Sequence, residues 1–205
     1  MYIPKSNLVT DKVEIVTFMK RFSFATIITA KNNYPTATHL PFLVSTRNDK
    51  IILTAHFARA NAHWKEIENT TALVIFSEPH AYISPKHYEN PESVPTWNYI
   101  AVHAYGTGKL IADAEEVFAV LEKTILAYEA EYKQQWATLP MGYKQKMLQG
   151  IVAFEIAVDD LQAKKKLSQN KTPAEQQSII EALSHSGNDQ ERGIAFYMQE
   201  NLRRK

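Results

Sequence analysis

The sequence predicts a mainly β protein with added helices (α+β), built on a small antiparallel barrel. Three observations lead to this prediction. About six runs rich in β-branched and aromatic residues follow one another along the 205 residues. The first of them are separated by turns of hairpin length, which implies antiparallel pairing. The long stretches of helical periodicity come only after Asp113. Six strands close a barrel poorly, so we expect a homodimer that covers the open side.

The amino-terminal half supplies most of the strands. A first helix is expected over 10–20, where Val13, Val16 and Phe18 share one face. A short helix is expected over 61–69. Runs of β-type residues between turn signals predict strands over 22–30, 36–46, 50–57, 70–84 and 97–112. Pro41 suggests an edge, a bulge or a strand end in the second run, and the run over 70–84 is expected to pass from a strand into a loop.

The carboxy-terminal part adds helices and one strand. From Asp113 onward, Val117, Leu121 and Ile125 recur at helical spacing, with acidic residues in the first turn. Thr172 followed by Glu175 forms a capping-box pattern. The remaining expected elements are a helix over 143–148, a strand over 150–158, a non-strand exit over 159–171, and helices over 172–187 and 189–205. The predicted division is a barrel over 1–160 and a helical extension over 161–205 packed on the same domain.

Composition excludes several classes of protein. The chain has no cysteine, which removes disulfides, thiolate metal sites, iron–sulfur clusters and a cysteine nucleophile. The net charge of +1 provides no field that would steer nucleic acid onto the whole surface. No apolar run approaches the ~20 residues that span a bilayer, so no membrane partner is expected. The cysteine-free composition fits the cytoplasm.

The stretch HFARANAHW, residues 56–64, joins a strand-like run to a helix-like run and concentrates groups that bind ligands. If Asn61 caps the helix, the amide groups of the first turn point back toward His56 and Arg59. A helix N-terminus beside a guanidinium group is a suitable site for a phosphate. The alternative is a capped turn in which Arg59 pairs with a nearby acid and Trp64 packs in the core.

Aromatic residues and histidines gather in two further stretches, EPHAYISPKHY (78–88) and VPTWNYIAVH (94–103). Aromatic rings at a barrel edge can hold a flat heterocycle by stacking. The alternative is a dimer interface, where Tyr and Trp are enriched. Both interpretations stay open, because ligand sites often lie at interfaces.

Motifs of several enzyme classes are missing from the sequence, including HExxH, GxGxxG, GxSxG and the P-loop. Six histidines between residues 39 and 103 nevertheless leave a metal or haem site open. The basic run AKKKLSQNK (163–171) could contact a phosphate or nucleic acid, although a solvated loop is the simpler interpretation. The last two helices could form a helix-turn-helix. Glu191 and Glu200 make the second of them a poor major-groove helix.

Five segments carry a resemblance to a known family: THLPF (38–42), HFARANAHW, EPHAYISP, VPTWNY and KKLSQNK. In this order and spacing they resemble the PaiB family, FMN-binding negative transcriptional regulators linked to protease synthesis and sporulation. The resemblance covers nearly the whole chain. It implies an antiparallel split β-barrel of the FMN-binding type with C-terminal helices, usually a homodimer with the flavin between subunits. A flavin-dependent oxidoreductase and a haem-binding or haem-degrading protein of this fold are the alternatives.

The resemblance also implies the cofactor site. FMN is the implied cofactor, with haem as the alternative, and DNA binding is implied at the level of the family only. In relatives that bind FMN, the end of the third strand and the helix after it hold the phosphate, and the second strand lines the isoalloxazine ring. Where the oxidase relatives have Ser-Arg-Lys, this chain has Ala58-Arg59-Ala60. The implied cofactor-binding residues are Thr38, His39, Leu40, Thr54, His56, Arg59, Asn61, Trp97 and Lys166.

Overall fold

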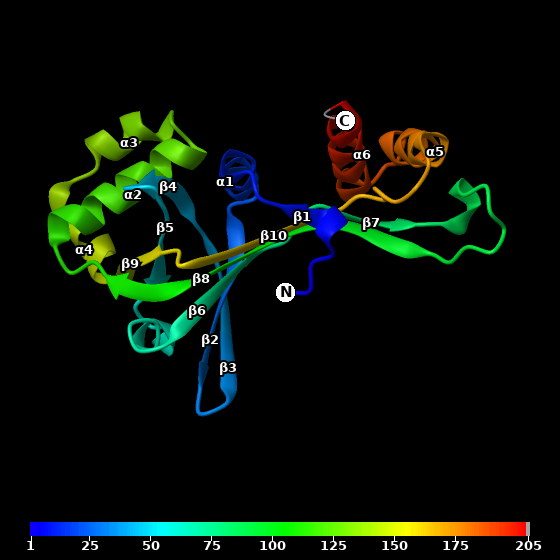
Figure 1. Cartoon of the computed structure of the whole chain (residues 1–205). Coiled ribbons are helices and arrows are strands. Elements are labelled where there is room, and N and C mark those ends of the chain that lie inside the picture. The colour runs from blue at the N-terminus through cyan, green and yellow to red at the C-terminus, as the bar shows by residue number, and fades with distance from the viewer. Residues whose placement is uncertain (204–205) are drawn as a thin grey trace. The chain divides into compact units, whose positions relative to one another are not determined.

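The computed structural model describes residues 1–203 (Figure 1). Arg204 and Lys205, the end of the last expected helix, lie outside the described residues. The chain forms two compact units. Unit 1 contains Met1–Asp11, Ser77–Val102 and the chain from Gln162 on, and unit 2 contains Lys12–Phe76 and His103–Leu161.

Unit 2 is built on antiparallel strands, as the sequence predicted. Their order in the sheet is β3-β2-β6-β8-β9-β5-β4. The hairpin turns lie at Asn32-Asn33 and Asn48-Asp49, and all four of these residues have positive φ angles, between 49° and 64°. Asn and Asp tolerate this left-handed conformation, which suits the tight turn of a hairpin. The strands are β2 (Phe24–Lys31), β3 (Tyr34–Pro41), β4 (Leu43–Arg47), β5 (Lys50–Ala58), β6 (Thr71–Phe76), β8 (Thr96–Leu110) and β9 (Ile151–Ala157).

Two of the predicted strands are each divided in the structure. The strand expected over 36–46 ends as β3 at Pro41, and β4 begins at Leu43. The chain changes partners at this point, because β3 pairs with β2 whereas β4 pairs with β5. The strand expected over 70–84 likewise becomes β6 and β7 (His80–Ile83).

The prediction that residues 159–171 form no strand is wrong for the first half of this segment, because Asp160–Lys166 forms strand β10. This strand pairs with the short strand β1 (Leu8–Val9), which the sequence did not predict either. Consecutive lysines gave β10 the appearance of a solvated loop. Lys164, however, is only 7% exposed, and its ammonium group lies over the rings of Tyr2 and Tyr99.

The helices of unit 2 agree with the prediction only in part. The expected helix over 61–69 is wrong, because only one 3-10 turn forms, η2 (Ala62–Lys65). Asp113 caps α2 by accepting from the amide groups of Glu115 and Glu116. The helix α3 was not predicted. The α-helices are α1 (Lys12–Arg21), α2 (Ala114–Tyr128), α3 (Tyr132–Thr138) and α4 (Met141–Gln149).

Four phenylalanines form the centre of the core of unit 2. Phe57 and Phe154, on the neighbouring strands β5 and β9, stack with ring centroids 4.9 Å apart. Phe42 contacts both Phe76 and Phe154 edge to face. All four side chains are completely or almost completely buried. This aromatic core fixes strand β5, which leads into the HFARANAHW turn.

Unit 1 combines short strands with the two last helices. Strand β7 pairs with the first part of β8, from His80↔Tyr99 to Ile83↔Thr96. The predicted capping box of Thr172 and Glu175 is confirmed at the start of α5. The remaining elements are η1 (Lys5–Asn7), η3 (Pro85–His87), α5 (Pro173–Ser184) and α6 (Asp189–Arg203). The C-terminal helices therefore share a unit with chain segments from before residue 160, and the predicted boundary at that residue stays a prediction.

Within residues 1–203, none of the helices has both the length and the apolar character that crossing a membrane requires.

Candidate functional site

The HFARANAHW turn of unit 2 is organised around one buried histidine. His63 is 3% exposed, and both of its ring nitrogens are hydrogen-bonded. Nδ1 lies 2.8 Å from the Thr38 hydroxyl and Nε2 lies 2.9 Å from the Thr29 hydroxyl. Asn61 caps the 3-10 turn by accepting from the amide of His63, and its Nδ2 donates to Thr38 at 3.1 Å. Two of the predicted cofactor residues, Thr38 and Asn61, are thus joined by a histidine that the sequence left unassigned.

The hydrogen bonds around His63 fix the position of its proton. The Thr29 hydroxyl donates to the Glu66 carboxylate at 2.6 Å, so its oxygen accepts from Nε2–H. Nδ1 then accepts from the Thr38 hydroxyl. Burial lowers the pKa of His63, and the nearby Glu66 carboxylate opposes this shift in part. The imidazole is therefore neutral at pH 7, with its proton on Nε2.

The lowered pKa of His63 predicts a loss of stability in mild acid. A histidine whose folded-state pKa lies below the unfolded value of about 6.5 contributes its full stability above that pH. The contribution is lost as pH falls through 6.5 toward the folded pKa, with a slope of at most about 1.4 kcal/mol per pH unit. We expect His63→Gln to flatten the pH dependence of the urea midpoint between pH 7.5 and 5.5.

His185→Gln is the matched control, since His185 is exposed at the end of α5. The prediction fails if His63→Gln and His185→Gln change the slope equally.

Arg59 is held in place by three consecutive backbone carbonyl groups. Its amide donates to the oxygen of Gly150 at 2.8 Å. Its side chain donates from Nε to Gln149 at 2.6 Å and from Nη2 to Ile151 at 2.9 Å. Two of the five guanidinium N–H groups are used in this way, so others remain for an anion. The alternative in which Arg59 pairs with an acid is not what the structure shows.

Arg59 lies at the edge of a cavity of about 550 Å³ in unit 2. Trp64 also lines this cavity, and its indole Nε1 donates to the backbone oxygen of Arg59 at 3.1 Å. Most of the other lining side chains are apolar and come from the end of β8 and from α2, α4 and β9. Small-molecule sites typically occupy about 300–1,000 Å³, with mostly apolar walls and a few polar anchors. This cavity therefore places a cation and an aromatic ring beside an apolar surface of suitable size.

The other predicted residues of unit 2 lie in different surroundings. His39 is exposed on β3 and stacks on Phe24 at a centroid distance of 6.3 Å. Leu40, the next residue, is buried. Burial lowers the pKa of His56 on β5. Thr54 lines a second cavity of about 710 Å³.

Trp97 and Lys166 belong to unit 1, where they contact each other. The ammonium group of Lys166 donates to the backbone oxygen of Trp97 at 2.7 Å and to the hydroxyl of Thr96. Burial lowers the pKa of Lys166. The half-exposed indole of Trp97 contacts the rings of His80 and Tyr82, at 5.7 Å and 6.0 Å between centroids. The aromatic gathering expected from the sequence is thus present within unit 1.

Sequence reasoning missed Thr29 and Glu66, which complete the hydrogen bonds of His63. Both residues lie in ordinary strand and loop sequence and belong to no motif, so a single sequence contains no signal for them. Residues 1–203 contain no group of three or more His, Asp or Glu side chains placed to hold a metal ion.

Comparisons with known proteins show the family of the chain. The family described as "Putative FMN-binding domain" matches residues 1–160. The chain is 39% identical over 211 residues to the protein "Protease synthase and sporulation protein PAI 2" of Bacillus subtilis, with 100% of both chains covered. It is also 30% identical over 203 residues to an uncharacterized protein of Emericella nidulans, covering 80% of this chain and 81% of the other.

Two solved structures share the fold at low sequence identity. The flavocytochrome Anf3 of Azotobacter vinelandii has a TM-score of 0.63 and 13% identity, with 80% of this chain and 72% of that chain covered. The FAD and haem binding protein of Mycobacterium smegmatis has a TM-score of 0.61 and 14% identity, with 78% and 73% covered. The predicted split-barrel fold with added helices is confirmed.

Proposed function

The chain belongs to the FMN-binding split-barrel family of the PaiB type, and from this premise we propose that it binds FMN and acts as a negative transcriptional regulator. The observation that supports FMN binding most directly is the cavity of unit 2 at Arg59 and Trp64. FMN needs a cation or amide donors for its phosphate and a flat apolar surface for its ring system. This cavity offers both.

The residues present fit FMN in a specific way. Arg59 is held by the carbonyl groups of Gln149 and Ile151, so its remaining N–H donors are already oriented before a phosphate arrives. Trp64 provides an aromatic face, and its indole is fixed by the hydrogen bond to Arg59. When bound, FMN supplies one- and two-electron redox chemistry. The neutral His63 is hydrogen-bonded to Thr38 and Asn61 and holds both residues in position.

A visible spectrum of the freshly purified protein tests the proposal. We expect flavin absorption bands, or quenching of FMN fluorescence when FMN is added to the colourless protein. A protein that is colourless and does not bind added FMN would disprove the flavin proposal. A Soret band would indicate haem, which the FAD and haem binding protein of Mycobacterium smegmatis also binds.

The regulatory part of the proposal rests on the resemblance to the PaiB family and on the 39% identity to the Bacillus subtilis protein. Two lysines of the basic run do not support a DNA contact there, because Lys164 is buried and Lys166 is bonded to Thr96 and Trp97. A gel shift against the upstream region of its own operon at physiological salt is the test. Binding without sequence preference would contradict a regulator that acts on DNA directly.

We also propose that the protein is a homodimer, since flavin sites of this fold usually lie between two subunits. Sedimentation at several protein concentrations measures this, and a monomer at all of them would contradict it.

A further inference from the structure

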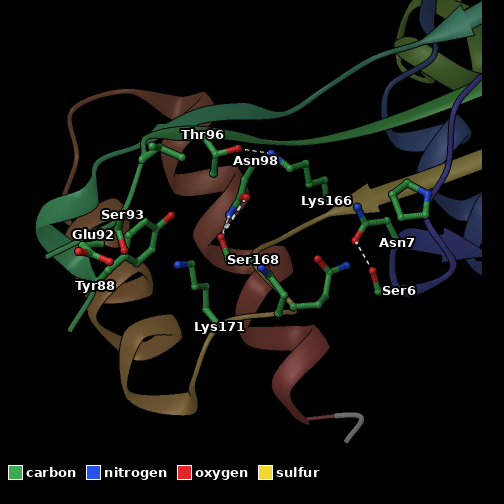
Figure 2. A pocket seen from close by; sticks show the side chains of 14 residues that line it. Ser6, Asn7, Tyr88, Glu92, Ser93, Thr96, Asn98, Lys166, Ser168 and Lys171 are labelled. Carbon is green, nitrogen blue, oxygen red and sulfur yellow. Dashed lines mark hydrogen bonds between the residues drawn. The ribbon is translucent and has the colours of Figure 1, made fainter. Parts of the chain in front are cut away.

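Unit 1 contains a cavity of about 490 Å³ that lies outside the Arg59 site (Figure 2). Its walls come from η1, from the loop after η3, from the start of β8 and from the turn that follows β10. Most of the lining side chains are hydroxyls, amides and ammonium groups. A cavity of this size falls in the range of about 300–1,000 Å³ that small molecules occupy.

The Tyr88 hydroxyl is a buried polar group without a partner in this cavity. The residue is 9% exposed, and its hydroxyl makes no hydrogen bond to any group in residues 1–203. Buried hydroxyls are almost always hydrogen-bonded, so such a group indicates a missing partner. Burial and the Glu175 carboxylate raise the pKa of Tyr88, which keeps the hydroxyl protonated and able to donate.

A cation lies over the ring of Tyr88. The Lys171 ammonium nitrogen is 3.5 Å from the centroid of the Tyr88 ring. Figure 2 shows the Lys171 ammonium group directed at the Tyr88 ring. Contact with the ring face directs an N–H group of Lys171 at the ring, and the ammonium group has three such donors, so others can still donate to a ligand. Lys166 is a second cation in the lining, and Glu92 contributes one negative charge.

A network of hydrogen bonds fixes the turn that carries Lys171. Ser168 has a φ of 57° and is paired through its hydroxyl with Asn98, which is completely buried. The backbone amide of Lys171 donates to the backbone carbonyl oxygen of Ser168 at 3.0 Å. The Lys171 oxygen in turn accepts from the Gln176 side chain at 2.7 Å.

Helix α5 also fixes the part of the lining that contains Tyr88. Glu175 completes the capping box of α5 and also accepts from the amide of Glu89, next to Tyr88. The first turn of α5 therefore holds both Tyr88 and Lys171 in place, and the lining is preorganised for a ligand.

We propose that this cavity is a second ligand site, which binds a small organic anion through the Tyr88 hydroxyl and the Lys171 ammonium group. The positive balance of the lining favours an anion, and the hydroxyl and amide side chains suit a ligand that also has hydroxyl groups. The anionic group is a phosphate or a carboxylate. In a flavin-binding regulator, such a site would bind an effector.

Calorimetric titration of the full-length protein, saturated with FMN, tests this proposal. The probes are ribose 5-phosphate, citrate and, as the uncharged control, ribose. We expect ribose 5-phosphate or citrate to bind and ribose to bind at least about tenfold more weakly. Binding by one anion alone identifies the phosphate or the carboxylate as the source.

Variants separate a ligand contact from a structural role. Tyr88→Phe should weaken anion binding about 3- to 10-fold, and Lys171→Met about tenfold or more. The melting temperature of Tyr88→Phe without ligand should not fall, because the lost hydroxyl has no partner to lose. Tyr143→Phe and Lys31→Met, at exposed positions of unit 2, should bind the anions like the unchanged protein.

Three results would overturn the proposal: neither anion binds, ribose binds as well as the anions, or Tyr88→Phe and Lys171→Met bind like the unchanged protein. FMN titration of the same variants distinguishes this site from the proposed flavin site. The family resemblance assigns Lys166 to FMN, and loss of FMN binding in Lys171→Met would show that this cavity holds the flavin itself. A protein that fails to bind FMN but still binds the anions would disprove the flavin proposal alone.

Discussion

Replacing Arg59 by alanine should weaken FMN binding about 10- to 100-fold, the loss expected for a charge-assisted hydrogen bond of about 1.5–3 kcal/mol. The guanidinium group is held by Gln149 and Ile151 at the edge of a 550 Å³ cavity, so its free N–H donors are fixed in direction. Alanine removes both the charge and the donors. Fluorescence titration of FMN measures the change in dissociation constant.

Two further variants make this result specific. Arg59→Lys keeps the positive charge but loses the planar group that contacts two carbonyls at once, so we expect an intermediate affinity. Arg192→Ala removes a guanidinium group of unit 1 that pairs with Asp189, and FMN affinity should not change. Equal affinities for Arg59→Ala and Arg192→Ala would remove Arg59 from the FMN site.

The largest effect on stability is expected at Phe154. Its side chain is 0% exposed, stacks on Phe57 and meets the edge of Phe42. Phe154→Ala removes these contacts and leaves a cavity in the core of unit 2, at a cost of about 3–5 kcal/mol. That is a large part of the about 5–15 kcal/mol by which domains are usually stable. The midpoint of urea unfolding should fall accordingly.

Phe24→Ala is the matched control for this prediction. Phe24 is 69% exposed on β2, where it stacks on His39, and its loss should cost less than about 1 kcal/mol. If both alanine variants lowered the urea midpoint by the same amount, the aromatic core would not have the role assigned to it.

The antiparallel strands of unit 2 could be predicted because their turns are local. Asn-Asn at 32–33 and Asn-Asp at 48–49 tolerate positive φ angles, so neighbouring residues alone determine these hairpins. The capping box of Thr172 and Glu175 is equally local and was also predicted correctly. Such features need no knowledge of distant parts of the chain.

Features that depend on distant partners could not be predicted. Strand β10 contains three consecutive lysines, and burial of Lys164 depends on the rings of Tyr2 and Tyr99 and on a hydrogen bond to the backbone oxygen of Tyr2. The helix expected over 61–69 stops after one 3-10 turn, and Asn61 and His63 bond to Thr38 and Thr29 instead. In both cases tertiary contacts outweigh local preference.

The candidate site likewise has one feature that the sequence predicted and another that it could not predict. The sequence identified Arg59 from residue type and position in the turn, and the structure places it at the edge of a cavity. The partners that orient it, however, are backbone carbonyl groups of residues 149 to 151, which residues of any type could supply. No single sequence can reveal a contact of this kind.

The composition of the two units limits how the protein can be divided. Unit 1 draws on three separate stretches of chain and unit 2 on two, and strand β8 continues from one unit into the other. A contiguous fragment therefore cannot contain one complete unit without also containing part of the other. A chain cut after residue 161 would lose the partner of β1 and the Glu175 carboxylate that holds Glu89.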